Sequence, residues 1–203
     1  MEFLCRFVHC WKHRLMMSMT DFSWEQFPEL RLATAEDLPQ LLTFFAQVRK
    51  GLEGAGIYQW GPAYPAAEQI RKDIAEQHVF CWGEKMVGTI TLDQQQSSQY
   101  EAVQWQIIGR QIGVIHRLAV HPDYWGQGLA KKLCLFAEEW GRSQGWEAIR
   151  LDTYSENPAS QRLYESLGYQ RAEGSCYFHD NPAPFFLYEK RISDEFKPEH
   201  LGC

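Results

Sequence analysis

The segment from residue 112 to residue 141 constrains this chain most, because a strand-like run passes through a glycine-bearing turn into a helical pattern. Ile112 to Val120 favours a strand, and apolar residues recur at helical spacing from Gly126 to Gly141. Small residues at such a turn let the backbone approach a ligand, and the first amides of the helix favour an anion. The segment therefore predicts either a phosphate or pyrophosphate cradle or a simple tight turn before a helix.

Two nucleotide-binding motifs share this layout but do not fit the spacing. A P-loop requires G-x-x-x-x-G-K-[ST], which the sequence lacks. A dinucleotide-binding fingerprint requires G-x-G-x-x-G, and the pair Gly126 and Gly128 is not followed by the third glycine. A nucleotide-binding domain is thus the weaker interpretation of the loop.

The pattern along the rest of the chain predicts one α/β domain with a mixed sheet. Helices and strands neither alternate throughout nor separate into two halves, so helices should cover the faces of the sheet. Residues 94–111 predict a flexible connection. The expected strands are 30–33, a hairpin within 78–92, 112–120, 147–154, 169–178 and 185–192. The first expected helix starts at Thr34 or Asp37, and three further helices are expected over 65–77, 126–141 and 158–167.

The same segment resembles the acetyl-CoA motif of the GNAT acetyltransferases, [Q/R]-x-x-G-x-[G/A] after a strand that ends V-x-P. Val120-His121-Pro122, Gly128 and Ala130 match this motif, whereas Trp125 stands where the family usually has glutamine or arginine. The resemblance continues through residues 149–169 and covers about residues 29–192. It implies a GNAT-type, mostly antiparallel mixed sheet flanked by helices, and an acetyl-CoA-dependent N-acetyltransferase without a metal. The alternative is a catalytically silent acyl-CoA sensor or subunit.

The resemblance implies a set of coenzyme-binding residues. Backbone groups of Leu118 and Val120 should pair with the pantetheine arm, and Asn157 should hydrogen-bond that arm or simply cap the helix that follows. The remaining candidates form the turn and helix start, at Trp125, Gly126, Gln127, Gly128, Leu129 and Ala130.

Two residues are the main candidates for proton transfer. In many GNAT enzymes a tyrosine at the position of Tyr164 protonates the leaving thiolate; the alternative is a tyrosine packed against the last strands. His116 is the candidate general base, because an ammonium must lose a proton before it attacks and histidine titrates near neutral pH. A core or surface histidine is the alternative, and Glu84 and Glu101 are weaker candidates for the base.

An aromatic, proline-broken segment is the candidate acceptor site. Tyr58, Trp60 and Tyr64 could surround an aromatic or cationic amine, or they could plug an edge of the core. The expected acceptor is a small-molecule amine or a peptide N-terminus, and direct attack in a ternary complex is expected because no cysteine lies in a nucleophile pattern. The oligomeric state, a homodimer included, stays open.

Composition and charge narrow the remaining classes. The net charge of −6 without a long basic run argues against nucleic acid, and no apolar stretch is long enough to predict a membrane span. Cys81, Cys134 and Cys176 lie in apolar segments and predict reduced core thiols of a cytoplasmic protein. We expect residues 1–28 to form a poorly ordered extension, 29–193 the domain, and 194–203 a tail.

Overall fold

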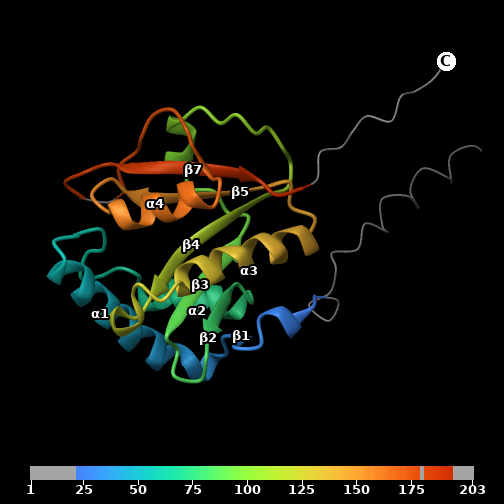
Figure 1. Cartoon of the computed structure of the whole chain (residues 1–203). Coiled ribbons are helices and arrows are strands. Elements are labelled where there is room, and N and C mark those ends of the chain that lie inside the picture. Colours follow the sequence, from blue (N-terminus) through green and yellow to red (C-terminus); the bar gives the residue numbers. More distant parts are fainter. Residues whose placement is uncertain (1–21, 179–180, 194–203) are drawn as a thin grey trace, which may run out of the picture.

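A computed structural model describes residues 22–178 and 181–193 and contains a seven-stranded sheet in the order β1-β2-β3-β4-β5-β7-β6 (Figure 1). All neighbouring strands pair antiparallel except β4 and β5, which run parallel. The predicted α/β fold with a mostly antiparallel sheet is confirmed. The strands are β1 (Leu30–Leu32), β2 (Val79–Trp82), β3 (Gly88–Asp93), β4 (Ile112–Val120), β5 (Ala148–Tyr154), β6 (Gln170–Arg171) and β7 (Phe185–Arg191).

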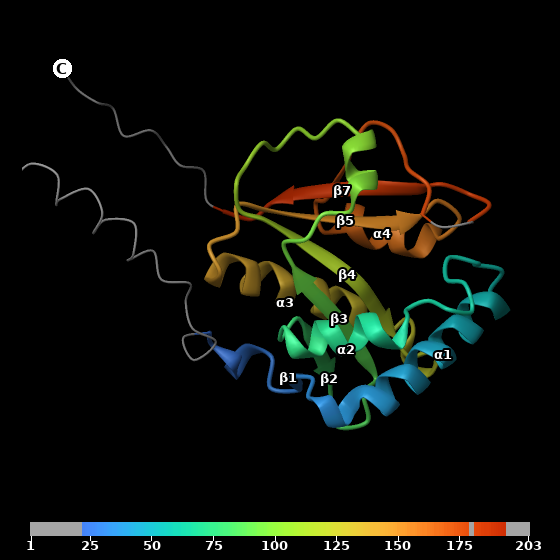
Figure 2. The ribbon, with the colours of Figure 1, turned by 180° about the vertical axis from the view of Figure 1, so that it is seen from behind.

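Helices cover both faces of this sheet. Figures 1 and 2 show α3 (Leu129–Ser143) and α4 (Pro158–Ser166) on one face, and α1 (Leu38–Gly54) and α2 (Ala67–Ala75) on the other. The α3 face buries Leu133, Phe136 and Trp140 against the strands, at the spacing that the sequence predicted. This two-sided core holds β4 and β5 in place from both sides.

The first helix begins where its capping residues place it. Thr34 and Asp37 form a capping box around the short 3-10 turn η3 (Ala35–Asp37), and α1 starts at the next residue. Asp37 is also held by a bidentate ion pair with Arg31, with both N–O distances at 2.7 Å. These bonds lower the pKa of Asp37 to about 2, the Arg31 hydrogen bond being the main cause.

Aromatic residues before the predicted domain boundary at residue 29 belong to the core. Phe22 and Phe27 are buried, and Phe22 packs edge-to-face against Phe136 and Trp140 of α3. The short 3-10 turn η2 (Trp24–Gln26) lies between them. Packed structure therefore extends to the last residues of the expected extension; the rest of it and residues 194–203 lie outside the described residues.

Two sequence expectations differ from the structure. Residues 94–111 contain a 3-10 turn, η4 (Ser98–Ala102), that packs the buried Tyr100 onto the sheet. The strand expected over 169–178 was too long: β6 ends at Arg171, and only isolated bridges at Glu173 and Cys176 follow. Gly174 explains the break, because its φ of +106° lies outside the strand region.

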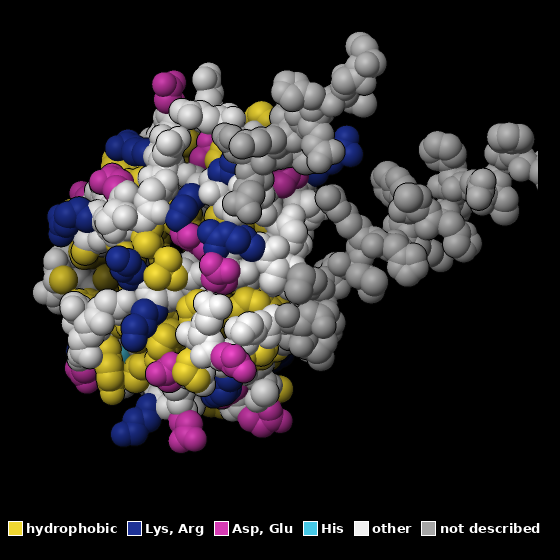
Figure 3. All heavy atoms as spheres, turned by 45° about the vertical axis from the view of Figure 1, so that its right-hand side comes forward, with side chains coloured by type: hydrophobic (Ala, Val, Ile, Leu, Met, Phe, Trp, Pro, Cys, Tyr) yellow, Lys and Arg dark blue, Asp and Glu magenta, His cyan; other side chains and the backbone are white. Residues whose placement is uncertain are grey.

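Charged side chains of both signs lie on the surface, and three cysteines lie in the core. On the face in Figure 3, Lys and Arg side chains are interspersed with Asp and Glu side chains. Cys81, Cys134 and Cys176 are buried and unpaired, as predicted. Within the described ranges, no helix has the length and apolar character that a membrane crossing would need.

Candidate active site

The candidate site lies where the two parallel strands separate. The pairing of β4 with β5 ends at Ile115 and Leu151, and the strands diverge beyond these residues (Figure 1). A cavity of about 400 Å³ opens along the unpaired part of β4, between the starts of α3 and α4 and the end of α1. All the predicted coenzyme-binding residues except Gln127 line this cavity: Leu118, Val120, Trp125, Gly126, Gly128, Leu129, Ala130 and Asn157.

The start of α3 has the geometry of an anion cradle. Gly126 and Gly128 have φ values of +74° and +77°, and Gly128 is the N-cap without a side chain to satisfy the first amides of the helix. No atom lies within 4 Å of a Cβ built at either glycine, so the backbone faces open space. Gln127 is exposed, and its side-chain amide donates to the carbonyl of Asp123 at 3.2 Å instead of pointing into the cavity.

Trp125 contacts the strand edge that was expected to bind the pantetheine arm. Its indole Nε1 donates a hydrogen bond of 2.8 Å to the carbonyl oxygen of Val120. A Cβ at Gly51 of α1 would lie 3.2 Å from the Trp125 ring and 2.4 Å from Pro122, so only glycine lets α1 approach this loop. Trp125 thus bonds the backbone of β4, and the sequence motif did not indicate this bond.

Asn157 caps α4 and also bonds the acceptor-side loop. Its Oδ1 accepts from the amide of Ser160 at 3.2 Å, which is the predicted N-cap. Its Nδ2 donates to Oε1 of Gln59 at 2.8 Å. Gln59 lines the same cavity and was not predicted, so it ties the segment that carries Trp60 to the coenzyme side of the site.

His116 is paired with a carboxylate that the sequence analysis missed. Its Nε2 lies 3.0 Å from Oδ1 of Asp93, the last residue of β3. The His116 side chain is 21% exposed and that of Asp93 7%, so the imidazole is the more accessible of the two. Neither residue is among those that line the 400 Å³ cavity. Burial opposes ionisation of Asp93, but the hydrogen bond and charge of His116 outweigh it and lower the pKa. A polar residue ending an otherwise apolar strand was the only sequence signal.

Tyr164 lies in the core on the α4 side, beside the cavity and not in its lining. Its ring packs against Tyr169 and Tyr188, with centroids 5.9 and 6.0 Å away. Burial raises the pKa of Tyr164 well above its usual value, and Cys134 and Asp152 add to this effect. The hydroxyl therefore stays protonated. The ring packs against the last strands, which was the expected alternative to a role as the acid.

The three predicted acceptor-site aromatics have different environments. Trp60 lines the cavity and packs against Tyr64 at a centroid distance of 5.8 Å. Burial raises the pKa of Tyr64, while the charge of Arg117 opposes the shift. Tyr58 is 58% exposed and does not line the cavity. Of the three, only Trp60 lines the cavity; Tyr64 packs behind it, and Tyr58 lies outside.

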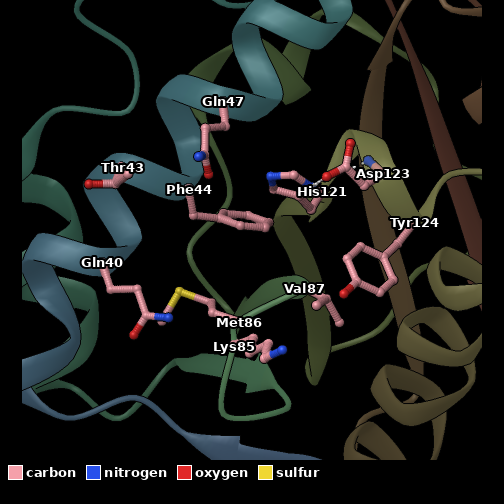
Figure 4. Close-up of a pocket in the computed structure, with 10 residues that line it drawn as sticks. All are labelled: Gln40, Thr43, Phe44, Gln47, Lys85, Met86, Val87, His121, Asp123 and Tyr124. Atoms are coloured by element: carbon pink, nitrogen blue, oxygen red, sulfur yellow. Dashed lines mark hydrogen bonds and ion pairs between the residues drawn. The ribbon is translucent and has the colours of Figure 1, made fainter.

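A second cavity of about 360 Å³ shares Tyr124 with the first, and Figure 4 shows its lining residues. In Figure 4 the His121 ring lies beside Phe44 of α1, and its Nδ1 accepts from the amide of Asp123 at 3.3 Å. This bond makes His121 the N-cap of the 3-10 turn η5 (Pro122–Tyr124). No cluster of three metal-ligating side chains occurs in the described part of the chain.

Comparison with known proteins shows the family and the fold of this chain. Residues 45–169 match the model of the acetyltransferase (GNAT) family. Among curated proteins, the uncharacterized N-acetyltransferase YesJ of Bacillus subtilis is 23% identical over 167 residues, which cover 80% of this chain and 89% of YesJ.

Solved structures share the fold at low sequence identity. An acetyltransferase of the GNAT family from Streptococcus agalactiae superimposes with a TM-score of 0.66 at 21% identity, covering 82% of this chain and 95% of its own. The PaiA N-acetyltransferase of Thermoplasma acidophilum, solved in complex with coenzyme A, superimposes with a TM-score of 0.59 at 18% identity, covering 80% and 98%.

Proposed function

Because this chain belongs to the acetyltransferase (GNAT) family and is an acetyl-CoA-dependent acyltransferase, we propose that it transfers the acetyl group directly to a primary amine within a ternary complex. One observation carries the proposal: a single cavity runs from the start of α3 along the unpaired edge of β4 to Trp60. We place the meeting of coenzyme and acceptor beside His116, which lies outside this lining but on the same strand as Leu118, where the strands separate.

The residues of this cavity suit a long, anionic coenzyme with an amide-rich arm. The amides that follow Gly126 would hold the pyrophosphate, since they start a helix and have no side-chain cap. The edge of β4 at Leu118 would pair with the pantetheine arm as an added strand does. Without the coenzyme, Trp125 bonds the carbonyl of Val120, and Gln59 bonds the side chain of Asn157. When the pantetheine arm binds, Trp125 and Gln59 would give up these bonds to it.

The acid and the base lie on opposite faces of the sheet at this point. His116 follows Ile115 on β4 and faces the α1 side, whereas Tyr164 comes from α4. Because Asp93 holds Nε2 of His116, Nδ1 is the nitrogen that takes the proton of the amine. An acceptor from the α1 side and a thioester from the α4 side would then meet in the gap between β4 and β5.

Two proton transfers accompany the proposed acetyl transfer. His116 takes one proton from the ammonium, the amine nitrogen bonds to the acetyl carbon, and the carbon–sulfur bond breaks. Tyr164 gives its proton to the sulfur and recovers one from the new amide nitrogen, and His116 releases its proton to water. The products are the N-acetylated amine, the free coenzyme thiol and one proton.

Direct transfer predicts that the protein itself is never acetylated during turnover. Burial raises the pKa of Cys81 and Cys176 to about 12, and raises that of Cys134 further, so these thiols are poor nucleophiles. Initial rates at varied acetyl-CoA and amine should give intersecting reciprocal lines, and mass spectrometry after acetyl-CoA alone should find unmodified protein. Parallel lines together with an acetylated protein would refute direct transfer.

Replacing Tyr164 with phenylalanine should slow turnover while leaving coenzyme affinity nearly unchanged. The ring packing against Tyr169 and Tyr188 remains, and only the proton donor is lost. We expect a fall of roughly 10²-fold in both kcat and kcat/KM, as for an interaction made in the transition state. Single-turnover rates check this, and Tyr169→Phe is the matched control; a wild-type rate in Tyr164→Phe would assign Tyr164 to packing alone.

A further inference from the structure

Asp152 of β5 is a carboxylate next to His116 that the proton-transfer scheme leaves unused. It follows Leu151, the last residue of β5 paired with β4, just as His116 follows the partner residue Ile115. Because side chains alternate along paired strands, Asp152 and His116 project from the same face where the strands separate. An amine bound at His116 on this face would therefore lie beside Asp152.

The cations around Asp152 already have carboxylates of their own. Their pairs are Arg117 with Asp73 at 2.5 Å, His116 with Asp93 at 3.0 Å, and Arg150 with Glu189 at 3.7 Å. Asp152 has no ion pair with any described residue. These three pairs together with Asp152 thus contain four carboxylates and three cations, even when His116 is protonated.

A single neutral donor contacts Asp152. The Tyr100 hydroxyl donates to Oδ2 at 2.9 Å, and Oδ1 has no hydrogen-bond partner among the described residues. Tyr100 is fixed in turn, since it is buried and its carbonyl accepts from Nε1 of Trp105 at 2.9 Å. Burial raises the pKa of Asp152, although Tyr100, His116 and Arg117 oppose the shift. A charged Asp152 would therefore gain from a cationic partner.

We propose that Asp152 binds the ammonium form of the acceptor, which makes the acceptor an aliphatic amine that is protonated at neutral pH. Oδ1 would accept a hydrogen bond from the ammonium while the adjacent His116 removes one of its protons. A neutral arylamine brings no charge to this position and leaves the carboxylate uncompensated. This inference rests on the proposed function, amine acetylation, and specifies that the amine binds in its charged form.

Two isomeric acceptors test the proposal. Phenethylamine is an ammonium at neutral pH, whereas 4-ethylaniline has the same formula and is neutral; spermidine extends the comparison to a linear polyamine. We expect wild-type protein to acetylate the ammonium probes with a kcat/KM at least about 10-fold above that for 4-ethylaniline. In Asp152→Asn, the KM for the ammonium probes should rise by about 10- to 100-fold with little change in kcat, and the rate with 4-ethylaniline should not fall.

Controls separate this effect from damage to the fold. At neutral pH a raised folded-state pKa means that the Asp152 charge destabilises the fold, so Asp152→Asn should melt no lower than wild type. Glu156→Gln removes a nearby exposed carboxylate and should leave KM unchanged. A preference for 4-ethylaniline, or an unchanged KM in Asp152→Asn, would overturn the inference; transfer to no amine by wild-type protein that binds acetyl-CoA would refute amine acetylation itself.

Discussion

Replacing Gly128 with valine is expected to abolish acetyl-CoA binding while the fold survives. Gly128 has a φ of +77°, which a β-branched residue rarely adopts, and it is the exposed N-cap of α3. A side chain there would stand in front of the first amides of the helix, where we place the pyrophosphate. Losing two charge-assisted hydrogen bonds weakens binding by roughly 100-fold or more, which isothermal titration calorimetry can measure.

The other end of the same helix supplies a matched control. Gly145 also has a positive φ, +73°, and no atom lies within 4 Å of a Cβ built there. Gly145→Val therefore carries the same backbone strain far from the cavity and should bind acetyl-CoA normally. Equal affinities for wild type, Gly128→Val and Gly145→Val would remove the start of α3 from the coenzyme site.

Replacing His116 with glutamine is expected to cause the largest loss of rate. Glutamine can still hydrogen-bond Asp93, but it has no basic nitrogen to accept a proton from the amine. Loss of general-base catalysis should lower the single-turnover rate by roughly 10²- to 10³-fold, with coenzyme affinity preserved. His121→Gln is the control, because His121 bonds its own turn. An unimpaired rate in His116→Gln would make the His116–Asp93 pair structural and require another base.

The local parts of the site could be predicted from the sequence. The turn at Gly126 and Gly128 and the cap at Asn157 depend on residues within one strand–turn–helix segment, and the structure has both. The bounds of β4, from Ile112 to Val120, were likewise predicted, because its apolar run has clear ends. Strand β6 was not, since Gly174 breaks a run whose composition alone favours extension.

The long-range parts could not be predicted. Gln59 and Asn157 are 98 residues apart, and Tyr100 and Asp152 are 52 apart, so only the packed sheet brings them together. Trp125 was recognised as a departure from the motif, yet its bond to the Val120 carbonyl depends on how the loop folds back. Polar residues inside apolar strands, such as Asp152, were the overlooked signal.

Direct acetyl transfer to an amine is tested best by a single-turnover experiment with acetyl-labelled acetyl-CoA. Enzyme in excess is first incubated with the labelled coenzyme and then mixed with an aliphatic primary amine. We predict that label appears in the amine at the same rate as free thiol appears, with none on the protein before or during the reaction. Label that appears first on the protein, or thiol release without an acetylated amine, would contradict the proposed function.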